Sequence, residues 1–171
     1  MNMKKIFLVL GVVSALCLPG IGYAGTAYLP SYHVNGLNSD NEFSWTTLSL
    51  TNISGSQLNN VTIQLYDGGT NTSHQPITYY VMGPNGSMLA TGSVLSNASF
   101  SFDLPQQTNV TVVFEKDGNS GPTTSGYAKI SYISDVKSLI AHGAIAGKQI
   151  GLDGKIIEFS RTLTINGSNE F

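Results

Sequence analysis

Few residues of this sequence have the types and spacing that nucleophilic or metal chemistry requires. The single cysteine, Cys17, lies in an apolar segment at the N-terminus, so the rest of the chain has no thiol nucleophile and no cysteine metal ligand. His33, His74 and His142 lie far apart and lack the short spacing of a metal-binding pair. His142 falls in an apolar run, where we expect a packed side chain with one hydrogen bond. We therefore predict no catalytic residue, no metal site and no cofactor.

Two short motifs allow other interpretations. Residues 117–122, Asp-Gly-Asn-Ser-Gly-Pro, resemble the sequence around the nucleophilic serine of chymotrypsin-like proteases. Asn119 replaces the acidic residue of that pattern and no histidine has a matching context, so we interpret the motif as a hairpin turn. Asp40 and Glu42 could bind Ca²⁺, but an acidic turn is favoured because the longer acidic series of a calcium loop is missing. Paired carboxylates depend on the fold, which leaves a small hydrolase as the least favoured alternative.

Four aromatic residues form the candidate ligand site: Trp45, Tyr66, Tyr79 and Tyr80. Trp45 and Tyr66 occupy outward positions of two predicted strands. Rings on the outside of a β-sandwich can stack on sugars, while Asn or Asp side chains at the rim bind the hydroxyl groups. The alternative is that the rings cover a sheet edge or pack under a loop. The sequence thus predicts an aromatic platform for a carbohydrate as a hypothesis.

The elements that position these rings are predicted to be β-strands. In residues 45–67, Leu48 and Leu50 alternate with threonine and serine, and a second alternating segment follows at 61–66. Alternation with period 2 is typical of strands that bury one face. Turn-forming residues separate the two segments, so we predict a central antiparallel hairpin.

The same alternation recurs along the chain, which predicts about eight or nine strands and no amphipathic helix after residue 24. Residues 139–146 could form a buried strand or a short helix, and glycines in that run weaken the helix alternative. Pro30 is expected on an edge strand. Arg161, on the inward face of the last strand, would lie at a bulge, pair with a carboxylate or protect an edge from pairing with another chain. Further strands are predicted at 27–34, 77–82, 88–95, 99–104, 109–115, 125–133 and 155–165, the last with Ile157, Phe159, Leu163 and Ile165 facing inward.

Residues 1–24 have the features of a secretory signal peptide: Lys4 and Lys5, an apolar run, a Pro-Gly break and a small-x-small cleavage signal. A membrane anchor is less favoured because the apolar run is short, and a lipoprotein signal at Cys17 lacks a proper lipobox. We predict a signal-peptide helix followed by one domain, residues 25–171. The product would be secreted, periplasmic or at the cell surface, with no membrane span after cleavage.

Charge is sparse, and this excludes some partners. The chain has 8 basic and 10 acidic residues, a net charge of −2, and only 11% charged residues. No basic patch is visible, so neither nucleic acid nor anionic lipid is an expected partner. A small outer-membrane β-barrel, suggested by the terminal Phe171, is a minor alternative because alternate positions near that end are polar.

Three short motifs are similar to uncharacterised bacterial secreted proteins with an immunoglobulin-like sandwich: Thr51-Asn52, Tyr66-Asp67-Gly68 and Gly126-Tyr127-Ala128. The resemblance implies a fold and leaves function open. The fold class predicted from all these patterns is an all-β antiparallel β-sandwich, immunoglobulin-like or jelly-roll. The expected function is that of an exported, non-enzymatic surface, adhesive or assembly component, with a carbohydrate-binding module as the alternative. Its partner would be a protein or glycan at the cell envelope.

Overall fold

The computed structural model of the chain describes residues 23–36, 42–68, 76–95, 97–116, 123–134, 137–165 and 171. The predictions made for the signal peptide, for Asp40, for His74 and for the motif at 117–122 lie outside the described residues. The first strand begins at Tyr23 and so includes the last two residues of the segment assigned to the signal peptide.

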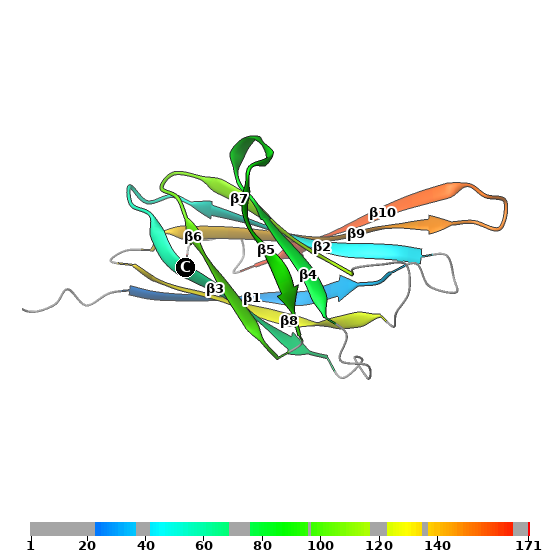
Figure 1. Cartoon of the computed structure of the whole chain (residues 1–171), viewed down its shortest axis with the longest axis horizontal. Helices are drawn as coiled ribbons and strands as arrows, with labels where there is room; N and C mark the ends of the chain where they lie inside the picture. Colours follow the sequence, from blue (N-terminus) through cyan, green and yellow to red (C-terminus); the bar gives the residue numbers. More distant parts are fainter. Residues whose placement is uncertain are drawn as a thin grey trace, which may run out of the picture.

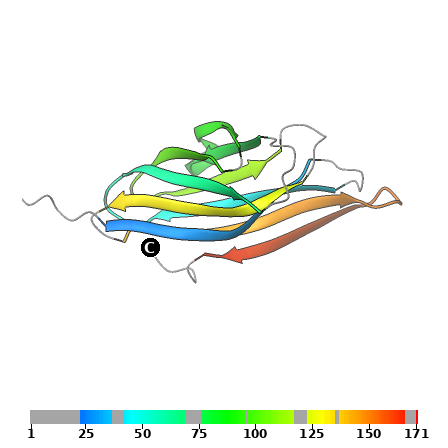
Figure 2. The same ribbon diagram turned by 90° about the horizontal axis from the view of Figure 1, so that it is seen from below.

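The described residues form ten β-strands in two antiparallel sheets that pack face to face (Figure 1, Figure 2). The prediction of an all-β sandwich is confirmed, with more strands than expected. Within the described part of the chain, no helix has the length and apolar character needed to cross a membrane. The strands are β1 Tyr23–Val34, β2 Glu42–Asn52, β3 Leu58–Asp67, β4 Ile77–Met82, β5 Met88–Val94, β6 Ser99–Leu104, β7 Asn109–Glu115, β8 Thr124–Ser134, β9 Leu139–Ile150 and β10 Ile156–Thr164, with a 3₁₀ turn, η1 Pro84–Gly86, between β4 and β5.

The strand order is that of a jelly roll. One sheet has the order β1-β8-β3-β6, and the other contains β2-β7-β4-β5, so β1, β2, β3 and β4 alternate between the sheets. An immunoglobulin-like sandwich would instead pair several strands with their neighbours in sequence. The strand order therefore agrees with the jelly-roll alternative. Two further strands extend the second sheet, because β9 pairs with β2, and β10 forms the edge.

The predicted central hairpin is wrong, although both of its strands exist. β2 lies in the six-stranded sheet and β3 in the four-stranded sheet, so the segment between them crosses the sandwich. The buried side chain of Asn52 holds this crossing: its Nδ2 donates to the carbonyl oxygens of Ser56 at 2.8 Å, Pro105 at 3.0 Å and Leu104 at 3.3 Å. Turn-forming residues suit a crossing as well as a hairpin, which is why the local pattern did not distinguish them.

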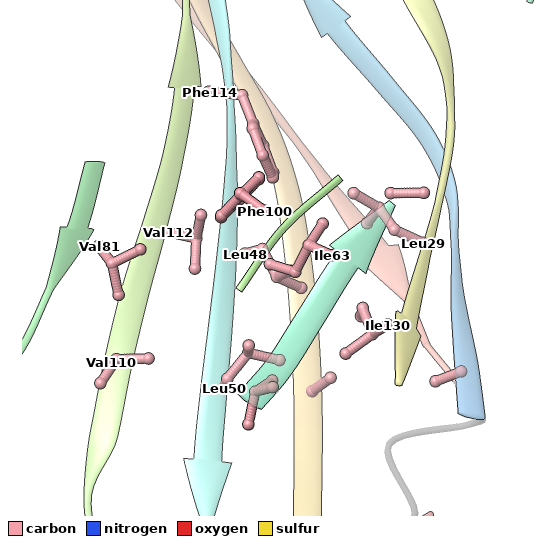
Figure 3. Close-up of a cluster of buried hydrophobic side chains, with 14 of the residues drawn as sticks. Leu29, Leu48, Leu50, Ile63, Val81, Phe100, Val110, Val112, Phe114 and Ile130 are labelled. Carbon is pink, nitrogen blue, oxygen red and sulfur yellow. The ribbon is translucent and has the colours of Figure 1, made fainter. Parts of the chain in front are cut away.

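The core lies between the sheets, with side chains of both pointing toward one another (Figure 3). Leu48 and Leu50 of β2 are buried, as their alternation predicts. Gly143 of β9 faces Leu29 of β1, and a Cβ at Gly143 would lie 2.5 Å from the Cδ1 atom of Leu29. This close approach explains a glycine in the apolar run, and that run is a strand rather than a helix. His142 is exposed on the other face, so its predicted packing is wrong.

The β9–β10 hairpin projects beyond the other strands (Figure 1, Figure 2). Its turn is closed by backbone hydrogen bonds from Gly151 to Lys155 and from Gly154 to Gly151. The predicted inward face of β10 is buried only near its end, where Leu163 is 4% exposed. Ile157 and Phe159 are exposed because the opposite sheet does not reach them, and here the prediction is wrong. Pro30 lies on the edge strand β1, as predicted.

Candidate functional site

The four aromatic residues predicted as a site are not brought together. Tyr66 lies on the outer face of the four-stranded sheet, and Trp45 lies on the outer face of the six-stranded sheet. Tyr80 also points outward from the six-stranded sheet, two strands away from β2. Tyr79 points inward and stacks on Phe100, with ring centroids 3.8 Å apart. The prediction that the side chains of Trp45 and Tyr66 point outward is correct, but the two rings lie on opposite sides of the molecule.

A row of tyrosines forms around Tyr66 instead. Its ring stacks on Tyr127 of β8 at a centroid distance of 4.6 Å and an angle of 6°. Tyr127 is followed by Tyr28 of β1 at 6.5 Å. Tyr66 and Tyr127 are directly opposite in the β3–β8 register. Tyr28 and Tyr127 are not among the site residues predicted from the sequence. Alternation along each strand shows that their side chains point outward, but it does not show that β1, β8 and β3 lie side by side.

Tyr127 also borders a hollow that we call the edge groove. It has a volume of about 610 Å³ and is lined by residues of β1 and β10, among others. These two strands are the edges of the two sheets and run beside each other (Figure 2). Tyr127 and Phe159 are 42% and 40% exposed, so both present ring surface to solvent. The residues that line the groove are Pro30, Ser31, Tyr32, His33, Gly68, Ser125, Gly126, Tyr127, Ile145, Phe159 and Arg161.

The local sequence of β1 and β8 creates one wall of this groove. The register of β1 on β8 shifts between Leu29 and Tyr32, so β1 bulges at Pro30. The shift directs the ring of Tyr32 inward over Gly126, where it is fully buried. A Cβ at Gly126 would lie 1.8 Å from the backbone oxygen of Tyr66 and 2.9 Å from the Tyr32 ring. Only glycine fits this position.

The charge of the groove comes from Arg161. Among the described residues that line the groove it is the only charged one, and no carboxylate is among them. The ion pairs of the hairpin, Lys148–Glu158 and Lys155–Asp153, both at 3.0 Å, do not include it. Of the three roles predicted for Arg161, a bulge is absent from the described β9–β10 register, and pairing with a described carboxylate is not observed. Arg161 does lie on an edge strand, as the third interpretation requires.

The interior of the sandwich behind the groove is polar. Ser44 and Thr46 of β2 face inward, in the register rows of Phe159 and Arg161 respectively. The Thr46 hydroxyl donates to the carbonyl of His33 at 2.9 Å and accepts from its amide at 2.8 Å. The side-chain oxygens of Ser44, Asn35 and Thr124 are buried and have no hydrogen-bond partner among the described residues. Buried polar atoms of this kind favour neighbours that can hydrogen-bond.

A second, smaller hollow lies beside Trp45 on the outer face of the six-stranded sheet. It measures about 460 Å³, and its lining includes the small side chains of Ala146 and Ser160. Phe43 packs beside Trp45 with ring centroids 5.5 Å apart. The predicted residue Trp45 therefore borders a depression, and Phe159, which also lines the edge groove, is the other aromatic residue among the described residues that line it.

Titratable groups do not suggest another centre. Within the described residues, no three His, Cys, Asp or Glu side chains lie close enough to hold a metal ion. Burial lowers the pKa of Lys116, and the hydrogen bonds from Lys155 lower the pKa of Asp153. Neither residue lines the edge groove. What the groove offers is aromatic surface, hydroxyl groups and one guanidinium, which are groups that bind ligands.

Comparison with known proteins gives no family. No family model and no curated protein matches the chain. Among solved structures, the Yersinia pseudotuberculosis-derived mitogen is similar at 13% identity and a TM-score of 0.37, over 68% of this chain and 91% of that one. PirA follows at 12% identity and 0.35, over 64% and 93%. A lectin binding domain of Lectinolysin complexed with Lewis b gives 14% and 0.30, over 50% and 70%. Values this low establish neither kinship nor function.

Proposed function

We propose that this protein is an exported, non-enzymatic binding protein and that it binds a carbohydrate in the edge groove. The observation that supports this is that two exposed aromatic residues, Tyr127 and Phe159, line one groove together with Ser31, which carries a hydroxyl group. The C–H face of a sugar packs on aromatic rings, while its hydroxyl groups need hydrogen-bond partners. The volume of about 610 Å³ lies within the range of small-molecule sites. The pattern of residues 1–24 supports export.

A glycan array followed by calorimetry tests this proposal. We expect Tyr127→Ala and Phe159→Ala each to weaken binding by about five- to thirtyfold, since stacking contributes roughly 1–2 kcal/mol. Trp45→Ala is the matched control, because it removes an aromatic ring on the outer face of the other sheet. Absence of glycan binding would refute the proposal. Binding that depends on Trp45 and not on Tyr127 would move the site to the second hollow, because Phe159 lines both hollows.

A second candidate function, assembly of the protein with copies of itself, is favoured by the β9–β10 hairpin. β10 is an edge strand, and its first seven residues are exposed. The hairpin also exposes Ile150, Leu152, Ile156 and Ile157. Unpaired edges with apolar side chains promote pairing with another chain. Light scattering after size exclusion should then show a dimer or larger species that Ile157→Lys dissociates, whereas a monomer at all concentrations would exclude this candidate.

A further inference from the structure

We propose that the edge groove selects sugars that carry a carboxylate, and that the guanidinium of Arg161 binds this carboxylate. The inference rests on the proposed function, since it names the class of sugar that the same groove takes.

The charges around the groove favour an anion there. Arg161 is the one charged side chain among the described lining residues, while the chain as a whole has a net charge of −2. An acidic ligand therefore gains little from the protein's overall charge and needs a local cation. A groove with low-dielectric aromatic walls strengthens the field of such a cation.

The arrangement of side chains on β10 fits one sugar ring. Phe159 and Arg161 are two residues apart on the same strand, so they point to the same face and stand roughly 7 Å apart. Across the strand pair, Arg161 is opposite Ile145, which also lines the groove. A pyranose that lies against Phe159 can therefore direct a carboxylate on the ring toward Arg161.

Neither ion pair found among the described residues engages the guanidinium of Arg161. Lys148 and Glu158 pair directly opposite each other on the other face of the hairpin, so that Glu158 is turned away from Arg161. The other ion pair of the hairpin, Lys155–Asp153, lies at its turn. Arginine offers two parallel N–H donors that match the two oxygens of a carboxylate, which a lysine cannot do. The same two donors also suit a tetrahedral oxyanion, so a sulfated sugar is needed to distinguish a carboxylate from a sulfate ester.

Calorimetry with matched sugars tests the inference. The probes are trigalacturonate against its methyl ester, and sialyllactose against lactose, together with sulfated lactose. We expect at least one carboxylated sugar to bind at least tenfold more tightly than its neutral partner, and added salt to reduce the difference. Arg161→Gln should weaken binding of that sugar by about tenfold to a hundredfold, and Arg161→Lys should restore only part of it.

Lys148→Gln is the control, because it removes the same charge from the opposite face of the hairpin and should leave affinity unchanged. The inference would be overturned if neutral sugars bind as tightly as carboxylated ones, or if Arg161→Gln still prefers carboxylated sugars. Either result would leave the proposed function in place. Sulfated lactose that binds as tightly as the carboxylated sugars would overturn the assignment of a carboxylate. If no sugar binds, the proposed function fails together with the inference.

Discussion

Asn52→Ala should destabilise the sandwich more than most substitutions of a polar residue. The Asn52 side chain closes the crossing from β2 to β3 and reaches the end of β6 through the carbonyl of Leu104. Its Oδ1 also accepts from the amide of Ser54 at 2.9 Å and from the hydroxyl of Ser54 at 2.7 Å. One side chain thus joins the two sheets at the point where the chain changes sheet.

The expected cost follows from the surroundings of each bond. The bond to Leu104 is buried, so its carbonyl oxygen loses a donor that water cannot readily replace, at about 1–3 kcal/mol. The hydrogen bonds to Ser56 and Pro105 are partly buried, so water can partly replace them. Losing each of these bonds should therefore cost about 0.5–1 kcal/mol of stability. We expect a loss of about 3 kcal/mol for Asn52→Ala.

Asn52→Asp should be worse at neutral pH, because a carboxylate oxygen would replace the amide nitrogen that faces three carbonyl oxygens. Burial and these dipoles would raise the pKa of the new carboxyl group above its unfolded value. A group with a raised folded pKa contributes most to stability when protonated, so the penalty should be small near pH 4 and grow as the pH rises.

Urea unfolding measures both variants, followed by far-ultraviolet circular dichroism and by the fluorescence of Trp45, the sole tryptophan. Asn59→Ala serves as the control, since Asn59 is an exposed asparagine of β3 and should change stability by less than about 0.5 kcal/mol. A loss below about 1 kcal/mol for Asn52→Ala would refute the reasoning, because the buried carbonyl alone should cost that much.

Three further substitutions test other parts of the structure. Gly126→Ala should reduce the yield of folded protein or cost several kcal/mol, because the new Cβ meets the backbone oxygen of Tyr66; a near-native melting temperature would contradict this. Phe114→Ala should cost about 3–5 kcal/mol by leaving a cavity in the core, and a loss under 1 kcal/mol in urea unfolding would be inconsistent with full burial. Since burial lowers the pKa of Lys116, the unfolded state binds more protons between that pKa and 10.5. Stability should therefore rise with pH in that window, and Lys116→Met should flatten the rise; equal slopes would show that Lys116 does not cause it.

The individual strands were largely predictable from the sequence. Three segments, Ile77–Met82, Ser99–Leu104 and Asn109–Glu115, are strands at the predicted bounds. Alternation sets which side chains share a face, and it does so locally. It does not say which strand lies beside which, so the pairing of β2 with β7 and β9 could not be read from residues 45–67.

The candidate site was predictable only in its parts. The alternation of side chains correctly predicted that Trp45 and Tyr66 point outward. Alternation does not say whether two strands belong to the same sheet. Tyr127 joins Tyr66 because β3 pairs with β8, a contact between residues far apart in sequence. Arg161 stood out as a charge on an apolar face, but the groove that gives it a role forms only where the edges of two sheets meet.

The order of the strands also determines when this chain can fold. β1 and β2 have no sheet partner earlier in the sequence than β7, which begins at Asn109. At about 5–20 residues per second of synthesis, both strands stay unpaired for several seconds. Folding dominated by distant pairings is slow in any case, with times of milliseconds to seconds. A nascent polypeptide whose strands wait this long for their partners leaves alternating apolar faces exposed during synthesis, which increases the risk of aggregation.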